Sequence, residues 1–137
     1  MDRIGDKIEE ILTFLEDLNE IIPESLEDYI SNKEKKAACE RYFEKIIEAI
    51  TDIAFFVIKM KELRIPQDDS DAFGVLKENK IIDDVLSKKL KDAKGMRNIL
   101  AHEYGRIDDE IVFESLKEQL MPDIEEFIKQ IKKFLKK

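Results

Sequence analysis

The residues of this chain that are best suited to chemistry lie together in one short stretch, from Met96 to Tyr104. The stretch contains the only histidine of the sequence, His102, and begins with Arg97 and Asn98 next to each other. A guanidinium can bind phosphate oxygens through two parallel hydrogen bonds, and an imidazole can take up and release a proton at neutral pH. The combination therefore favours chemistry on a phosphate group.

The stretch is predicted to form the last turns of a helix, which Gly105 ends. Asn98 and His102 are four residues apart, so they share a helix face and the amide can orient the imidazole. Arg97 and His102 are five residues apart, so on one straight helix they point about 140° away from each other. Either Arg97 reaches round with its long side chain, or a second copy of the helix lies opposite.

The pattern R-N-x-x-x-H-x-Y, formed by Arg97, Asn98, His102 and Tyr104, resembles the signature of HEPN-domain proteins, and its H-x-Y ending resembles the HepT branch. The segment from Glu40 to Ala49 is similar to the third-helix segment of that branch, and the resemblance covers most of the chain. It implies a small helical bundle that forms a homodimer, with two motifs facing each other across a cleft. It also implies metal-independent RNase activity, and neutralisation by a minimal nucleotidyltransferase antitoxin that adds AMP to the motif tyrosine.

On this resemblance each motif residue has an expected role. Arg97 is expected to bind the scissile phosphate and to stabilise developing charge. His102 is expected to exchange a proton with the 2′-hydroxyl or the leaving oxygen of RNA. Asn98 is expected to orient His102 or to contact the phosphate, and Tyr104 to help position RNA and to accept AMP.

The charge of the chain is uneven along the sequence. The net charge of −8 argues against broad affinity for nucleic acid. From Lys88 to Arg106, however, six basic side chains stand against two acidic ones. This excess is typical of a solvated helix face and also of an RNA contact. We expect Lys94 and Arg106 to support RNA binding.

Other functions are compatible with the same residues. The chain can be a non-catalytic nucleotide- or partner-binding subunit of a nucleotidyltransferase, in which His102 only donates a hydrogen bond. It can also be a helical oligomer without an active site, because a histidine at a helix end often only complements the helix dipole. RNA cleavage by the purified protein, lost in a His102→Ala variant, separates these hypotheses.

The length and composition of the chain limit the possible fold classes and the cellular location that we expect. A length of 137 residues fits one domain over residues 1–137, 43% of the residues are hydrophobic, and glycine and proline are scarce. These features predict an all-α bundle of four main helices plus short ones. A single cysteine and a single histidine offer no cluster for a metal, and we expect no cofactor. No apolar run reaches membrane-spanning length and no signal-peptide core stands at the start, so we expect a cytoplasmic protein without membrane contact.

Apolar periodicity and caps predict the helices in order. Ser31 is expected to cap the long third helix, together with Glu34, and Asp108 to cap the last one. Pro122 is expected to kink or split that last helix. The predicted helices cover residues 2–22, a short turn within 23–30, 32 to about 63, 72–78, 83 or 84 to the motif, and 108 onward.

Two features point beyond a single chain. The segment Ile53–Ile58 is apolar on all sides, so it is either buried in the bundle centre or packed against another subunit, and we favour the second. Gly95 lies inside the motif helix, where it costs about 1 kcal/mol relative to alanine. Such a glycine often marks the close approach of another backbone or a ligand.

Overall fold

The structure is a computed structural model that describes residues 2–102 and 108–136. In these two ranges all regular secondary structure is helical, which confirms the predicted all-α class. The elements are α1 (Arg3–Ile21), α2 (Leu26–Ser31), α3 (Lys33–Met60), α4 (Asp69–Glu78), α5 (Asp84–His102), α6 (Asp109–Glu114), the π-helical turn η1 (Ser115–Gln119) and α7 (Leu120–Leu135).

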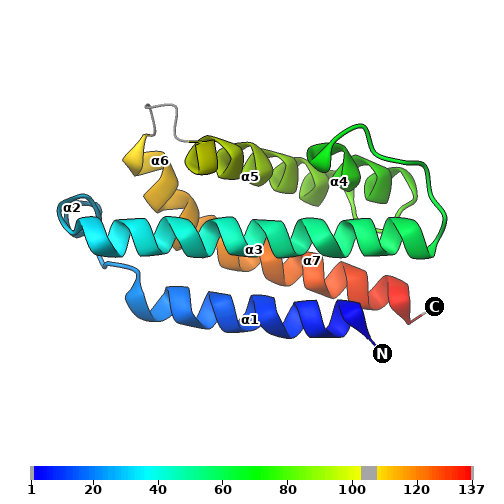
Figure 1. Cartoon of the computed structure of the whole chain (residues 1–137), viewed down its shortest axis with the longest axis horizontal. Helices are drawn as coiled ribbons and strands as arrows, with labels where there is room; N and C mark the ends of the chain where they lie inside the picture. The colour runs from blue at the N-terminus through cyan, green and yellow to red at the C-terminus, as the bar shows by residue number, and fades with distance from the viewer. Residues whose placement is uncertain (1, 103–107, 137) are drawn as a thin grey trace.

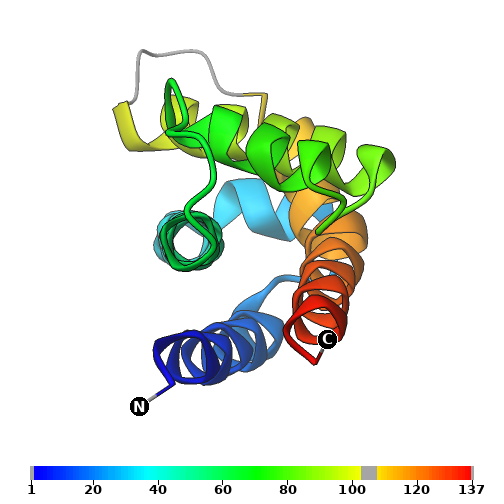
Figure 2. The same ribbon diagram turned by 90° about the vertical axis from the view of Figure 1, so that its right-hand side faces the viewer.

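Four long helices, α1, α3, α5 and α7, form the bundle, as predicted. Figure 1 shows α3 between α1 and α5, and the view along the helices shows α7 closing the open side (Figure 2). The short helices α2 and α6 lie at the end of the molecule opposite the chain termini, and α4 lies beside α5 (Figure 1). The motif at the end of α5 is therefore near α6.

The central helix α3 contributes buried side chains along its whole length. Ile53, Ala54 and Val57 are completely buried, and Phe55 and Phe56 are half-buried against the same core. Burial in the bundle centre therefore accounts for the apolar stretch without a second subunit. Our preference for a subunit contact at this place is not supported, because helices pack against α3 from several sides.

Some predicted boundaries are wrong by a few residues. Ser31 does not cap α3: it completes α2, and its hydroxyl donates to the Asp28 carbonyl. The cap is Asn32, whose side-chain oxygen accepts from the Lys35 N–H at 3.0 Å. Both residue types cap helices well, so the choice between neighbours depends on where the preceding helix ends. At its other end α3 stops at Met60 rather than near residue 63.

The last predicted helix is interrupted by a π-helical turn shortly before Pro122, in the region where a kink or split was predicted. Asp108 caps α6 as expected, accepting from the backbone N–H groups of Glu110 and Ile111. The chain then passes through the π-helical turn η1 before α7 begins.

Pro122 is the third residue of α7, which continues directly from η1: the Leu120 N–H donates to the Ser115 carbonyl. A proline has no N–H to donate, and its ring crowds the carbonyl four residues earlier, here that of Glu118 in η1. The position of the π-helical turn is therefore compatible with an effect of Pro122.

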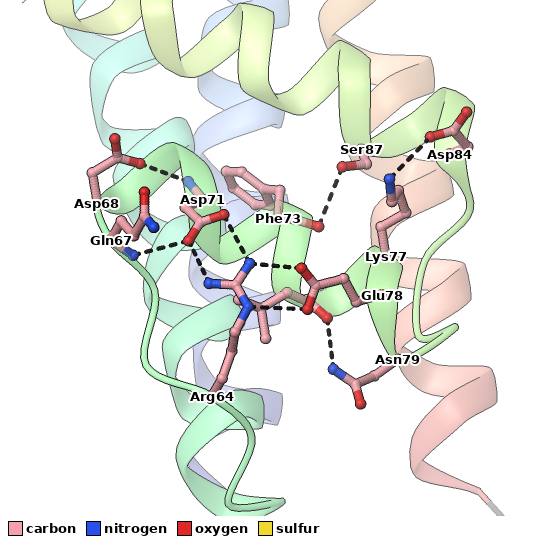
Figure 3. A network of polar contacts seen from close by, with 11 residues as sticks. Arg64, Gln67, Asp68, Asp71, Phe73, Lys77, Glu78, Asn79, Asp84 and Ser87 are labelled. Atoms are coloured by element: carbon pink, nitrogen blue, oxygen red, sulfur yellow. Dashed lines mark hydrogen bonds and ion pairs between the residues drawn. The ribbon is translucent and has the colours of Figure 1, made fainter.

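The helix α4 is joined to both of its neighbours by polar contacts (Figure 3). Arg64, in the loop after α3, donates to Asp71 at 2.7 and 3.1 Å and to Glu78 at 2.7 and 3.0 Å. On the other side the Ser87 hydroxyl of α5 donates to the Phe73 carbonyl at 3.2 Å. These contacts connect the end of α3, α4 and α5, so α4 helps to set the position of the motif helix.

Candidate active site

Arg97 points from α5 back onto α3 rather than into solvent. Its Nη2 donates to a carboxylate oxygen of Glu48, and its Nη1 donates to the side-chain oxygen of Asn98 at 3.4 Å. The Arg97 side chain is 19% exposed, and its buried Nε has no hydrogen-bond partner among the described residues. The guanidinium is thus oriented by a charged partner and keeps a donor for a further acceptor.

His102 is the last residue of α5 and is exposed, as is Asn98 one turn earlier. Arg97 is largely covered while His102 is exposed, so the two side chains lie on different faces of α5. This agrees with the divergence expected from their spacing. A single chain therefore does not present both groups to one phosphate along the same direction.

The other predicted site residues divide into two groups. Lys94 is 3% exposed and forms an ion pair with Asp69 of α4 at 3.2 Å. It belongs to the contact between α4 and α5 in this structure. Tyr104 and Arg106, and with them the predicted helix end at Gly105, lie outside the described residues.

Glu48 is the residue that reasoning from the motif alone missed. It lies on α3, 49 positions before Arg97, and its side chain is 42% exposed. The sequence held one signal: Glu48 is an acid between the apolar residues Ile47 and Ala49, inside the segment that resembles the family's third helix. An acid at such a place often pairs with a cation from a neighbouring helix.

The basic surface around the motif is smaller than the sequence count indicates. Lys94 is buried, and Lys89 pairs with Asp123 of α7 at 3.7 Å. Lys91 lies next to Gly74 and contributes to the positive potential at Asp71. Lys88 is exposed and forms no ion pair in the described part of the chain. The positive charge of α5 is thus divided between solvent-exposed surface and contacts inside the protein.

Two negative observations apply to the described residues only. Residues 2–102 and 108–136 contain no group of three His, Cys, Asp or Glu side chains that could hold a metal ion. In the same ranges no helix combines the length and the apolar character that crossing a membrane requires.

The fold and the site together define a class of protein. It is a small helical bundle whose third long helix, α5, ends with an Arg-Asn pair and an exposed histidine, and these residue types are suited to phosphate chemistry. The comparison with protein families is consistent with this class, because the family model "Ribonuclease HepT-like" matches residues 11–131. The chain belongs to this HepT-like family of HEPN proteins.

Named relatives and solved structures agree with the assignment. An mRNA nuclease HepT of Shewanella oneidensis is 37% identical over 89 residues, which are 65% of this chain and 66% of that protein. A tRNA nuclease HepT of Aphanizomenon flos-aquae is 31% identical over 110 residues, 80% of this chain and 75% of that one. A structure of the tri-AMPylated Shewanella oneidensis HEPN toxin with MNT antitoxin superposes with a TM-score of 0.91 at 28% identity, covering 97% of this chain and 99% of that one.

Proposed function

We propose that this chain is the metal-independent endoribonuclease toxin of a HepT–MNT toxin–antitoxin system. The observation that carries the proposal is the motif helix itself: α5 holds Arg97 in a defined orientation and ends on the exposed His102. Support also comes from the family match and from two relatives named as nucleases of mRNA and tRNA. RNA and ATP, the substrates this function needs, are found in the cytoplasm, where we place the protein.

The proposed reaction is attack of a ribose 2′-oxygen on the adjacent phosphorus. His102 accepts the 2′-hydroxyl proton, or, in its protonated form, donates one to the 5′-oxygen as the P–O5′ bond breaks. A second imidazole or a water supplies the other proton transfer, so the products are a cyclic phosphate and a 5′-hydroxyl. Arg97 binds the non-bridging oxygens and stabilises the charge that develops on them. Asn98 helps to orient these groups.

Two of the proposed contacts with RNA, those of Lys94 and Arg97, require a change in the ion pairs of the protein. For Lys94 to contact RNA, it must exchange Asp69 for a phosphate, because this side chain is almost fully buried in its present contact. Arg106 is proposed as a direct contact beside the motif. The phosphate must likewise share Arg97 with Glu48 or take the place of Glu48. Sharing is feasible because Nη1 and Nη2 each carry a second N–H, whereas Nε is buried.

We propose that the antitoxin silences the toxin at Tyr104. The phenol oxygen attacks the α-phosphorus of ATP, pyrophosphate leaves, and the phenolic proton passes to water. The added AMP brings negative charge next to the motif, which repels RNA phosphate. A similar protein solved as a tri-AMPylated toxin with MNT antitoxin supports AMP addition as the mode of neutralisation, and the motif tyrosine as the acceptor remains our proposal.

The decisive experiment is RNA cleavage by the purified protein in the presence of a chelator. We expect cleavage to persist with EDTA and to fall by about 10²–10⁴-fold in a His102→Ala variant, the range for loss of a general acid–base. The melting temperature should remain nearly unchanged, because His102 is exposed at a helix end. Equal cleavage by the variant removes His102 from the mechanism, and loss of cleavage with EDTA contradicts metal independence.

A further inference from the structure

A cleft of about 570 Å³ lies beside the motif helix, between α5 and the segment in which α6 passes through η1 into α7. Its apolar floor comes from three helices and is formed by Phe43, Ile47, Leu90, Met96, Leu120 and Ile124. Met96 directly precedes Arg97, so the cleft adjoins the candidate active site along the chain.

One wall of the cleft is formed by irregular backbone. The π-helical turn η1 contributes Ser115, Glu118 and Gln119 to one wall, and Pro122 follows in the first turn of α7. π-helical turns are rare and often occur at functional sites. Ile111, on the same wall, is 53% exposed although it is a large apolar residue. The wall therefore leaves apolar surface uncovered next to the floor.

The rim of the cleft is acidic. Asp92, Glu114, Glu118 and Asp123 stand against a single lysine, Lys89. Lys89 is paired with Asp123, and the other three acids form no ion pair within the described residues. The Asp123 side chain is 21% exposed, and this burial raises the pKa of its carboxyl group. An incoming cation at this edge would stabilise its charged form.

The acidic residues on the rim indicate which kind of molecule can bind in the cleft. Four carboxylates repel the phosphates of RNA, so the cleft is not part of the RNA path. A second copy of the chain docked symmetrically on this cleft would bring two acidic rims together, which is unfavourable. The complementary occupant is a protein segment in which Lys or Arg stands next to an apolar side chain.

We propose that this cleft is the docking site for a basic, apolar-tipped segment of the nucleotidyltransferase antitoxin. The inference rests on the proposed function, which requires the antitoxin to reach Tyr104, eight residues after Met96 in the sequence. The apolar side chain fills the floor, and the basic groups meet Glu114 and Glu118 on the rim. Docking on this side of α5 leaves the face that carries Gly95, Ile99 and His102 to a second copy.

The test reverses two rim charges in the variant Glu114→Lys/Glu118→Lys. The matched control, Glu9→Lys/Glu16→Lys, makes the same change of net charge on exposed positions of α1. Binding of the purified cognate antitoxin is measured by calorimetry. We expect Kd to rise at least tenfold in the cleft variant and to stay within twofold in the control. The salt dependence of binding should be weaker in the cleft variant only.

Two further readouts connect docking with function. AMP transfer to Tyr104 should slow in the cleft variant at low antitoxin concentration and recover at saturating concentration. RNA cleavage by the isolated cleft variant should not fall, because the rim does not contact the substrate. Unchanged Kd in a folded cleft variant overturns the inference while leaving the nuclease function intact.

Cross-linking covers the case in which the cleft variant does not fold. A photo-reactive amino acid in place of Gln119, on the cleft wall, should cross-link to the purified antitoxin. A cross-link only to a second copy of the chain, or only to RNA, overturns the inference. If the wild-type protein cleaves RNA but does not bind the antitoxin at all, the docking inference and the antitoxin part of the proposed function fail together, and the nuclease part stands.

Discussion

Arg97 is already paired with a carboxylate in the protein without bound RNA. Glu48 of α3 accepts from its Nη2, and Asn98 accepts from its Nη1. A charge-assisted contact of this kind fixes the plane of the guanidinium, which raises the precision of phosphate binding. The same carboxylate also repels the phosphate. Glu48 therefore improves the orientation of the Arg97 guanidinium but weakens its affinity for phosphate.

Substitution of Glu48 is expected to separate these two effects. In Glu48→Ala, kcat for RNA cleavage should fall about tenfold because Arg97 loses its orientation, while KM should fall or stay constant because a negative charge is removed. Glu48→Gln keeps a hydrogen-bond acceptor for Arg97 and should retain most of kcat. Steady-state kinetics on one RNA substrate provide the measurement. An equal loss of kcat in both variants would show that Arg97 needs the negative charge of Glu48, and that a neutral hydrogen-bond acceptor at the same place does not replace it.

At the scale of elements, α4 acts as the support of the motif helix. Lys94 of α5 is buried against it and pairs with Asp69, and Ser87 of α5 donates to a carbonyl of α4. A buried lysine with one carboxylate partner contributes little net stability, because desolvation offsets the attraction. It does restrict how α4 and α5 can pack, since any other arrangement would leave the charge unpaired.

Removing either partner of this ion pair should have unequal effects on stability. Asp69→Ala leaves the charge of Lys94 without its partner and should lower the free energy of unfolding by about 1–3 kcal/mol. Lys94→Met keeps the volume, removes the charge, and should leave stability unchanged or raise it. Urea unfolding of the two variants measures the difference. If Lys94→Met destabilises the protein more than Asp69→Ala does, the ion pair is a net stabilising contact.

The contact between Arg64 of the loop before α4 and Asp71 of α4 should make stability depend on pH. Hydrogen bonds from Arg64 lower the pKa of Asp71 from 3.8 to about 2, with help from the Gln67 N–H. The unfolded chain therefore binds a proton more readily than the folded one. The contribution of Asp71 is complete above about pH 4 and is lost as the pH falls towards 2.

A variant isolates this contribution from that of the other acids. Asp71→Asn should be less stable than wild type at pH 7, by about 0.2–1 kcal/mol because the Arg64 pair is exposed. The difference should vanish near pH 2. Melting temperatures of both proteins between pH 7 and pH 2 provide the comparison. A constant difference over this range would mean that the carboxylate charge of Asp71 is not involved.

At the scale of the whole molecule, the outward face of α5 is incomplete in one chain. A side chain at Gly95 would meet nothing within 4 Å, so no described part of the chain itself approaches this glycine. Ile99, one turn further, is 53% exposed, and His102 follows on the same side. We propose that a second copy covers this face in a homodimer. For Arg97 of one chain to meet His102 of the other, the Arg97 side chain must turn away from Glu48 of α3 and towards this face.

Mixing two inactive proteins tests the shared site. Arg97→Ala and His102→Ala subunits should each be inactive as homodimers, whereas some mixed dimers should recover cleavage. Subunit exchange is verified by native mass spectrometry, and each variant alone serves as the control. Absence of recovery despite verified exchange would exclude a site shared between chains. A monomer in light scattering at assay concentration would exclude the homodimer.

The sequence by itself determined the helices and the family. Period-3.6 apolar patterns define α1, α3, α5 and α7, because a helix in a small bundle must bury one stripe of side chains. The order Arg97, Asn98, His102 is a local spacing on one helix, so it can be read without knowledge of the fold. The same spacing correctly indicated that Arg97 and His102 diverge.

Only the tertiary structure decided what each of these groups contacts. Arg97 and Glu48 are far apart in sequence, and no local pattern predicts that α3 and α5 bring them together. Lys94 was expected to face RNA, yet the packing of α4 covers it, because burial depends on which helices meet and not on helical spacing alone. The π-helical turn η1 is a further case. Pro122 predicts a disturbance of the helix, but only the structure shows that it takes the form of a π-helical turn over Ser115–Gln119 rather than a break.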